Sequence, residues 1–317
     1  MIYYYLPQIG AISGGIKQIY RHIEILNSTG YNAKIFYGML DRNNLWFDNG
    51  CPKENNLLAI LSDDYIALPE ISLQCVNKFL TRTKNIIIFN QNCYYTFVST
   101  QYNLDKFKPI IYDFDIIKAF IVVSEDSRNY LNTCFPNNYI YRVFNGINDK
   151  LFYPQHKENI ITFMPRKNNN HINQIINIIS RNEILKGWKL IAVDNMTQSQ
   201  VADIFNSSKI FLSTGCPEGC PLPPLEAIFS GNVVVGYTGV GGKEYFDKQP
   251  TVISIEYNNI IEFVKMIIKY VEWYTNNSDE LTSKLINSIN YYKKTYSLEN
   301  EKNSIINAWE NIIKNNI

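Results

Sequence analysis

The residues best suited to chemistry lie in one stretch, which reads CPEGCPLPPLEA and holds Glu218 and Glu226 eight positions apart. A predicted strand precedes it, and a helix is predicted to open at Pro223 or Pro224, because proline suits the first helical turn. A helix start offers N–H groups and partial positive charge to a phosphate. Two carboxylates there would repel the phosphate unless they bind another group, and sugar hydroxyls are their natural partners. A spacing of eight between two glutamates is common by chance, but its place in a strand–loop–helix with Gly219 and two prolines favours a phosphate site whose carboxylates bind sugar hydroxyls.

The elements that must position this stretch follow an alternating pattern. Short apolar runs alternate with longer helical stretches, which is typical of βαβ units and predicts an α/β fold with parallel sheets. The predicted strands are residues 1–6, 33–37, 65–68, 85–89, 119–123, 141–144, 160–164, 190–193, 210–212, 233–235 and 251–255. The predicted helices are residues 14–27, 173–179, 199–207, 224–230, 260–275, 279–294 and 298–314. Ser124 is predicted to cap a further helix.

Length and composition fit two domains. The chain has 317 residues, of which 46% are hydrophobic and 19% charged, so each half can bury its own core. Asn145-Gly146 and then Pro154 interrupt the pattern, and we predict domains at residues 1–155 and 156–296. The helical content near the C-terminus exceeds what one small sheet needs. The last helix, within residues 297–317, is therefore expected to pack back on the first domain.

Charge and cysteine usage limit the partners and cofactors. The net charge of +1 does not favour a nucleic acid partner. No apolar run approaches the roughly 20 residues of a membrane span, so we expect a cytoplasmic protein whose peripheral contact with a membrane stays open. The cysteines are scattered, which fits reduced thiols. Cys216 and Cys220 have no second cysteine or histidine pair, so no metal cofactor is expected.

The Glu218 stretch has the order of a known signature. Glu218-Gly219, Leu222-Pro223 and Glu226-Ala227 resemble the E-G-x-G-L-P-x-x-E-A signature of the family-4 retaining glycosyltransferases. Further matches in that family's order are Gly14-Gly15-Ile16, Gly30-Tyr31, Val123-Ser124-Glu125, Asn145-Gly146-Ile147, Phe152 with Pro154, Gly231 with Val234-Val235, and Gly241-Gly242 with Glu244. These matches span nearly the whole chain. The resemblance implies the GT-B fold, with two Rossmann-like domains whose parallel sheets face each other across a cleft.

The resemblance also implies an activity. Members of that family move a sugar from a nucleotide-diphosphate-sugar donor to an acceptor and retain the anomeric configuration, here without a metal. By position, Glu226 should hold the ribose hydroxyls of the donor, and Glu218 should contact the donor sugar near its reacting carbon. Gly14 and Gly15 should let the N-terminal loop approach the diphosphate, because glycine permits close backbone contact. The two domains are expected to close over the donor about residues 145–154.

The phosphate loop departs from the family pattern. By resemblance, the backbone from Gly219 through Cys220 and Pro221 to Leu222 should line the phosphates. Cys220-Pro221 replaces the aromatic-glycine pair of the family, which removes one N–H group because proline has none. The loop should therefore offer the phosphates fewer backbone donors than is usual in that family.

Positive charge for the diphosphate is predicted after the strand at residues 160–164. Arg166 and Lys167 follow its carboxyl end, where open α/β sheets bind ligands. A site without a metal must neutralise the leaving group with Arg, Lys and amide dipoles. The family usually has a Lys about five positions after the Arg, where this chain has His171. Either Lys167 or His171 could complete the diphosphate site, and a solvated Arg-Lys pair is the alternative.

The sequence indicates less clearly which residues contact the acceptor. Many members of the family carry a His in the N-terminal domain, and this chain has no matching one; His22 fits a packed residue on the first helix. Gln91 and Asn92 follow a predicted strand, and they could contact a sugar or an acceptor or form an ordinary polar loop. The donor base and sugar, the acceptor and the oligomeric state cannot be read from the residues.

Three other functions are alternatives to a retaining glycosyltransferase. A GT-B protein that inverts configuration, or an epimerase, would share the fold without needing Glu218. A protein that kept the fold and only binds would suit the change to Pro221. A nicotinamide-dependent dehydrogenase would need a G-x-G-x-x-G turn, and Gly10 with Gly14-Gly15 does not give that spacing.

Overall fold

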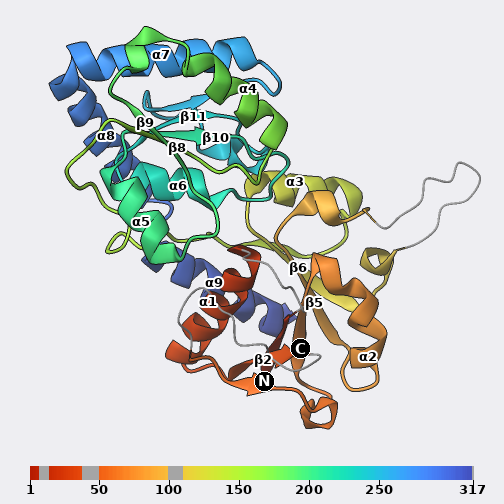
Figure 1. Ribbon diagram of the computed structural model, residues 1–317. Helices are drawn as coiled ribbons and strands as arrows, with labels where there is room; N and C mark the ends of the chain where they lie inside the picture. The colour runs from red at the N-terminus through yellow and green to blue at the C-terminus, as the bar shows by residue number, and fades with distance from the viewer. Residues whose placement is uncertain (7–13, 38–49, 99–109, 316–317) are drawn as a thin grey trace, which may run out of the picture. The chain divides into compact units, whose positions relative to one another are not determined.

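The computed structural model describes residues 1–6, 14–37, 50–98 and 110–315. Its internal contacts divide the chain into two compact units. Unit 1 comprises Met1–Phe144 together with Glu301–Ile317, and unit 2 comprises Asn145–Asn300. Each unit is built on its own parallel β-sheet with helices against it (Figure 1).

The sheet of unit 1 has the strand order β3-β2-β1-β4-β5-β6-β7, and its paired strands run parallel. The strands are β1 (Ile2–Leu6), β2 (Ala33–Tyr37), β3 (Lys53–Glu54), β4 (Tyr65–Pro69), β5 (Asn85–Asn90), β6 (Ile117–Val122) and β7 (Ile140–Arg142). The interior strand β5 is buried on both faces, which is why it is a continuous apolar run instead of an alternating one.

The helices of unit 1 lie on both faces of that sheet. They are α1 (Gly14–Ser28), α2 (Val76–Leu80), α3 (Glu125–Cys134) and most of α9 (Leu298–Asn315), with 3-10 turns at Leu57–Ala59, Glu70–Cys75, Cys93–Tyr95 and Ile111–Asp113. Successive residues of β1 point to opposite faces. Tyr3 packs in the core under α2 and α3, whereas the hydroxyl of Tyr4 accepts the indole N–H of Trp309 from α9 at 2.9 Å.

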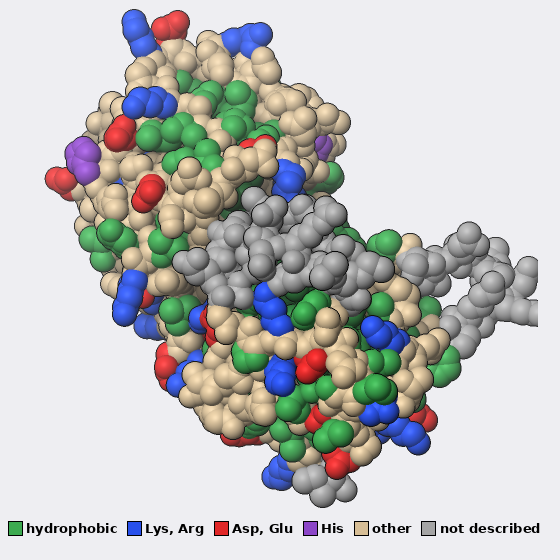
Figure 2. Space-filling view, turned by 60° about the horizontal axis from the view of Figure 1, so that its bottom comes forward, with side chains coloured by type: hydrophobic (Ala, Val, Ile, Leu, Met, Phe, Trp, Pro, Cys, Tyr) green, Lys and Arg blue, Asp and Glu red, His purple; other side chains and the backbone are tan. Residues whose placement is uncertain are grey.

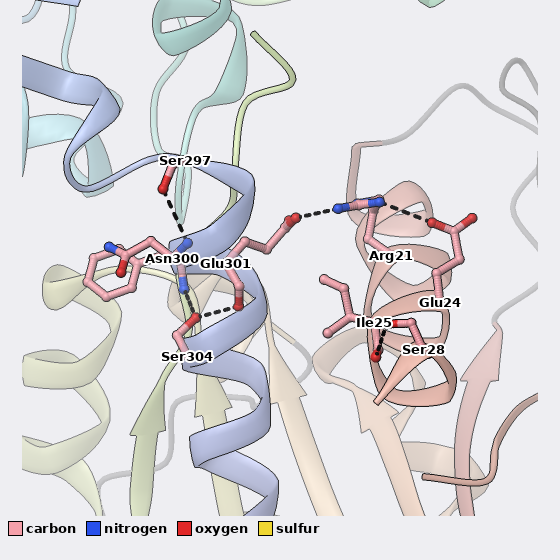
Figure 3. A network of polar contacts seen from close by, with 9 residues as sticks. Arg21, Glu24, Ile25, Ser28, Ser297, Asn300, Glu301 and Ser304 are labelled. Atoms are coloured by element: carbon pink, nitrogen blue, oxygen red, sulfur yellow. Dashed lines mark hydrogen bonds and ion pairs between the residues drawn. The ribbon is translucent and has the colours of Figure 1, made fainter. Parts of the chain in front are cut away.

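Polar contacts join α9 to α1. The guanidinium of Arg21 in α1 lies 2.8 Å from the buried carboxylate of Glu301 and 3.1 Å from that of Glu24 (Figure 3). In α9 itself, the hydroxyl of Ser304 donates to the carbonyl of Glu301 at 2.9 Å and accepts the N–H of Phe144 at 3.0 Å. The part of α9 from Glu301 onward is thus held to unit 1 by side chains as well as by packing.

The sheet of unit 2 has the parallel strand order β12-β11-β10-β8-β9. The strands are β8 (Ile160–Phe163), β9 (Lys189–Ala192), β10 (Ile210–Ser213), β11 (Val233–Gly236) and β12 (Val252–Ser254). The helices are α4 (Asn169–Ile179), α5 (Gln198–Ser207), α6 (Leu222–Phe229), α7 (Ile260–Asn276) and α8 (Ser278–Lys293), with 3-10 turns at Glu183–Leu185 and Gly241–Glu244. In Figure 1, α4 and α7 cover one face of this sheet, and α5 and α6 cover the other.

The α/β prediction is confirmed, and the differences are local. Each predicted strand and helix is present within a few residues of its predicted bounds, and Ser124 caps α3 by accepting the N–H of Ser127 at 3.1 Å. The strand β3 was missed because it is too short to show a period. The helix α6 begins at Leu222, ahead of the predicted Pro223 or Pro224.

The surface carries mixed charge. Figure 2 shows basic and acidic side chains interspersed among the described residues on the face in view, in keeping with the net charge of +1. Among the helices of the described ranges, none has both the length and the apolar character that crossing a bilayer requires.

Candidate functional site

The loops at the carboxyl edge of the sheet in unit 2 are joined by side-chain hydrogen bonds. Because the strands are parallel, the loops that follow β8 and β10 leave the sheet at the same edge. The side-chain amide of Asn168 donates to the carbonyl of Thr214, and the hydroxyl of Thr214 donates to the carbonyl of Lys167 at 2.9 Å. These bonds hold the loop that carries Lys167 against the loop that leads to Glu218.

A third loop, after β11, holds the backbone of Glu218 on both sides. The N–H of Glu218 donates to the carbonyl of Gly239 at 2.7 Å, and the N–H of Gly241 donates to the carbonyl of Glu218 at 3.1 Å. A Cβ atom on Gly241 would lie 2.0 Å from the carbonyl oxygen of Gly219, so a side chain cannot fit there. The Gly241-Gly242 motif therefore serves to let two loops touch along their backbones.

The side chain of Glu218 meets Lys167. The carboxylate Oε2 of Glu218 lies 3.5 Å from the Nζ of Lys167, and the two side chains are 22% and 39% exposed. The carboxylate also lies over the backbone of Gly215, where a Cβ atom would be 1.8 Å from Oε1. Glycine at position 215 thus makes the space that Glu218 occupies, and this requirement was missed because it depends on the fold of the loop.

The start of α6 has few backbone donors. An α-helix normally begins with four N–H groups that have no partner in the helix. Here Pro221 is the N-cap residue and Pro223 and Pro224 lie in the first turn, so Leu222 supplies the one N–H group among these four positions. Both later prolines lie inside the helix, in its first turn. Contact of Gly219, Cys220 and Leu222 with a phosphate stays a prediction.

Arg166 lies in the same loop as Lys167, and Glu226 lies on the helix that follows the loop of Glu218. Glu226 is one turn into α6 and half-buried. Arg166 is exposed and follows β8 directly ahead of Lys167. The structure places these predicted site residues on α6 and on the β8–α4 loop, and it joins Lys167 with Glu218.

His171 lies in the first turn of α4, next to two tyrosines. Its Nδ1 is 3.0 Å from the hydroxyl of Tyr237, and its ring packs 5.2 Å from that of Tyr257. Burial raises the pKa of Tyr237, and the hydroxyl of Tyr237 accepts the backbone N–H of Asn258. The phenol proton is therefore directed at Nδ1 of His171. We assign the neutral tautomer of His171 with its proton on Nε2, a hydrogen-bond donor.

The carboxyl edge of the sheet in unit 1 brings Gln91 to Gly15. A Cβ atom on Gly15 would lie 3.2 Å from Oε1 of Gln91, so the amide of Gln91 covers the start of α1. Asn92 is 9% exposed, and its side-chain oxygen accepts the N–H of Tyr94 at 3.2 Å. Of the two residues predicted to contact an acceptor, Asn92 therefore caps a turn of its own chain. Gly14 begins α1 and is exposed; the loop that precedes it lies outside the described residues.

A buried glutamate, Glu70, supports this turn and was missed by sequence reasoning. It follows β4, and its Oε2 accepts the N–H of Gln91 at 3.0 Å; its carboxylate also accepts the N–H of Asn92. Burial raises the pKa of Glu70 to about 7. No spacing in the sequence links position 70 to position 91, so no signal could have found this contact.

His22 is a packed residue, as its place on the first helix predicted. It is buried in unit 1, and its Nδ1 lies 2.8 Å from the hydroxyl of Tyr4. Burial lowers the pKa of His22 to about 3, so the ring is neutral near pH 7.

The cysteines and acidic residues give no metal set within the described ranges. There, no three His, Cys, Asp or Glu side chains gather closely enough to hold a metal ion, and Cys216 and Cys220 form no disulfide bond. That the function needs no metal stays a prediction.

Comparison with known proteins found likenesses in structure alone. No protein-family model matches the chain, and no curated protein sequence matches it. A mutant of Staphylococcus aureus TarM, solved with fondaparinux, α-GlcNAc-glycerol and UDP, superposes with a TM-score of 0.61 at 18% identity, covering 80% of this chain and 56% of TarM. Sucrose-phosphate synthase from Thermosynechococcus elongatus superposes with a TM-score of 0.67 at 11% identity over 99% of both chains.

A third likeness is to Anabaena HepE in complex with UDP-glucose, with a TM-score of 0.66 at 10% identity over 98% of this chain and 100% of HepE. This chain spans little more than half the length of TarM and nearly all of the other two proteins. Together with the two parallel sheets, these likenesses show that the chain has the GT-B fold, as the sequence predicted.

Proposed function

We propose that this protein is a glycosyltransferase that moves a sugar from a nucleotide-diphosphate-sugar donor to an acceptor hydroxyl. The observation that carries the proposal is the Lys167–Glu218 pair, 3.5 Å apart at the carboxyl edge of a parallel sheet in a GT-B fold. One cation for a diphosphate and one carboxylate for sugar hydroxyls suit such a donor. The solved complexes of TarM with UDP and of HepE with UDP-glucose support the class of ligand.

Each residue of unit 2 has a proposed task. Lys167 and Arg166 neutralise the diphosphate as it leaves, because charge that develops in the transition state is best stabilised by groups already in place. The Nε2–H of His171 donates a hydrogen bond to a phosphate oxygen. Glu218 accepts hydroxyls of the donor sugar, and Glu226 accepts those of the ribose.

The stereochemistry is proposed to be retention, on the strength of the Glu218-to-Glu226 signature. In such a reaction the C1–O bond to the diphosphate breaks first. A diphosphate oxygen then takes the proton of the acceptor hydroxyl as that oxygen bonds to C1 on the same face. The charge on the leaving group is carried by Lys167 and Arg166, so no metal is required. A product with inverted configuration in an NMR time course would contradict this assignment.

Unit 1 is proposed to bind the acceptor at the edge where Gln91 lies. Among the described residues, no group hydrogen-bonds the side-chain amide of Gln91, which leaves a donor and an acceptor for a ligand hydroxyl. Gly15 lies beneath that amide and adds no side chain that would block it.

The first experiment is thermal unfolding with UDP, GDP, ADP and dTDP, each with and without Mg²⁺. A ligand that binds the folded state alone adds RT ln(1 + [L]/Kd) of stability, about 2.7 kcal/mol at a hundredfold excess over Kd. We expect one diphosphate to raise the Tm of the wild type without Mg²⁺. Glu226→Ala should lose this shift, and Glu272→Ala, a matched change on the exposed side of α7, should keep it. If no diphosphate shifts the wild type, the proposed function is wrong.

A binding protein without transferase activity is the second candidate. The prolines at the start of α6 favour it, because they remove N–H groups that would stabilise a leaving diphosphate. The two candidates differ in turnover. Steady release of UDP from UDP-glucose by the wild type supports the transferase, whereas binding of UDP without such release supports the binding protein.

A further inference from the structure

We propose that the Lys167–Glu218 ion pair exchanges partners on donor binding, so that Glu218 favours the intact donor over the bare nucleoside diphosphate. This inference rests on the proposed function and concerns the same site. In the structure, the carboxylate of Glu218 is paired with the ammonium of Lys167. When a donor binds, its sugar hydroxyls engage Glu218, and Lys167 is released to the diphosphate.

The pair is placed where an exchange is possible. Both side chains are partly exposed, at 39% for Lys167 and 22% for Glu218, so a ligand can reach either group. Ion pairs of this exposure contribute little net stability, and they therefore separate easily. A diphosphate carries more negative charge than a carboxylate and competes well for the same ammonium.

The backbone on both sides of the pair is held still. Glu218 is bonded through its N–H to Gly239 and through its carbonyl to Gly241. The carbonyl of Lys167 is bonded to the hydroxyl of Thr214. Movement is thereby confined to the two side chains, so an exchange of partners requires rotamer changes without rearrangement of the loops.

Lys167 is important for binding a diphosphate because the start of α6 offers few backbone N–H donors. Leu222 supplies the one N–H group among the N-cap and the first three positions of this helix. A diphosphate therefore depends on cationic side chains, and the cation paired with Glu218 must be freed first. A bare diphosphate has no sugar hydroxyl to engage Glu218, and it is repelled by the carboxylate that stays behind.

The consequence is discrimination between substrate and product. The donor engages Lys167 through its diphosphate and Glu218 through its sugar hydroxyls. The nucleoside diphosphate that remains after transfer engages Lys167 but is repelled by the carboxylate of Glu218. Glu218 would thus lower the affinity for the product and favour its release after transfer. The same carboxylate that orients the sugar would act against product inhibition.

The test is calorimetric titration of UDP and of UDP-glucose into the wild type, Glu218→Gln and Lys167→Met. Glu218→Gln keeps the size of the side chain and removes its charge. We expect it to bind UDP about threefold to tenfold more tightly than the wild type, the range for one partly exposed pair plus the lost repulsion. Its preference for UDP-glucose over UDP should fall by a similar factor. Lys167→Met should bind UDP about tenfold more weakly.

The controls separate this inference from the proposed function. Glu272→Gln makes the same charge change on the exposed side of α7, and it should bind UDP as the wild type does. Adding Glu218→Gln to Lys167→Met should raise the affinity for UDP less than it does in the wild type, because the pair is already broken. Equal or weaker binding of UDP by Glu218→Gln would overturn the exchange while leaving the donor site in place. If the wild type binds none of UDP, GDP, ADP and dTDP and none of the corresponding sugar donors, both the exchange and the proposed function are overturned.

Discussion

Both parallel sheets of this protein have a glutamate in a loop at the carboxyl edge. The two glutamates differ in burial. In unit 2, Glu218 is partly exposed, pairs with Lys167, and is held by backbone bonds while its carboxylate stays reachable. In unit 1, Glu70 is buried, and its carboxylate accepts the backbone N–H groups of Gln91 and Asn92. An exposed carboxylate can serve a ligand, whereas a buried one shapes the backbone that presents another residue.

The largest expected effect tests the exposed carboxylate. Glu218→Ala should lower the rate of UDP release from UDP-glucose by about 10²- to 10³-fold, the usual effect of removing one preorganised polar group from an active site. Its Tm should stay close to that of the wild type, because an exposed ion pair adds little stability. An unchanged rate would mean that Glu218 is no more than a surface residue.

Glu70, the buried carboxylate, should affect the stability of the fold instead of the reaction rate. The pKa of Glu70 is raised by burial to about 7, so between pH 4.5 and 7 the folded state binds more protons than the unfolded state at this group. Stability should therefore fall as pH rises through that window, by about 3 kcal/mol in all. Glu70→Gln mimics the protonated form and should lose this part of the pH dependence.

Urea unfolding at several pH values measures that effect as the difference between wild type and Glu70→Gln. His22 acts in the opposite sense, because burial lowers its pKa to about 3 and stability rises with pH between about 3 and 6.5. His22 is present in both proteins, so the difference isolates Glu70. If the difference in the free energy of unfolding between the two proteins stays constant between pH 4.5 and 7, the pKa of Glu70 is not raised in the folded state.

A smaller effect tests the rigid backbone of unit 2. Gly241→Ala puts a methyl group 2.0 Å from the carbonyl oxygen of Gly219, and we expect a loss of about 1–3 kcal/mol in the free energy of unfolding. UDP binding should weaken along with it, because the loop of Glu218 must shift. Gly50→Ala is the matched control, since its Cβ would meet no atom of the described residues within 4 Å. Equal stability of the two variants would show that the loop contact yields easily.

The smallest effect concerns His171. His171→Ala should weaken UDP binding by about 1 kcal/mol, the net contribution of one hydrogen bond, or roughly fivefold. Tyr237→Phe should have part of this effect, because the phenol no longer directs the proton of His171 to Nε2. Titration calorimetry would measure both. If UDP binding is the same in His171→Ala and the wild type, Lys167 and Arg166 serve the diphosphate without this ring.

Prediction from sequence succeeded where the pattern is local. The buried strands were readable because a parallel sheet covered on both faces needs continuous apolar runs, as in β5 and β11. It failed for β3, which is too short to show a period, and it placed the start of α6 one to two residues late.

The sequence by itself determined the α/β class. It also predicted Glu218 and Glu226 as charged groups of one candidate site, because they are close along the chain and the order of the residues around them is informative. The tertiary structure alone decided which groups meet. Lys167 reaches Glu218 across loops that follow different strands, and Glu70 reaches Gln91 in the same way. Parallel strands bring distant segments to one edge, and a linear pattern carries no record of the side chains that face each other there.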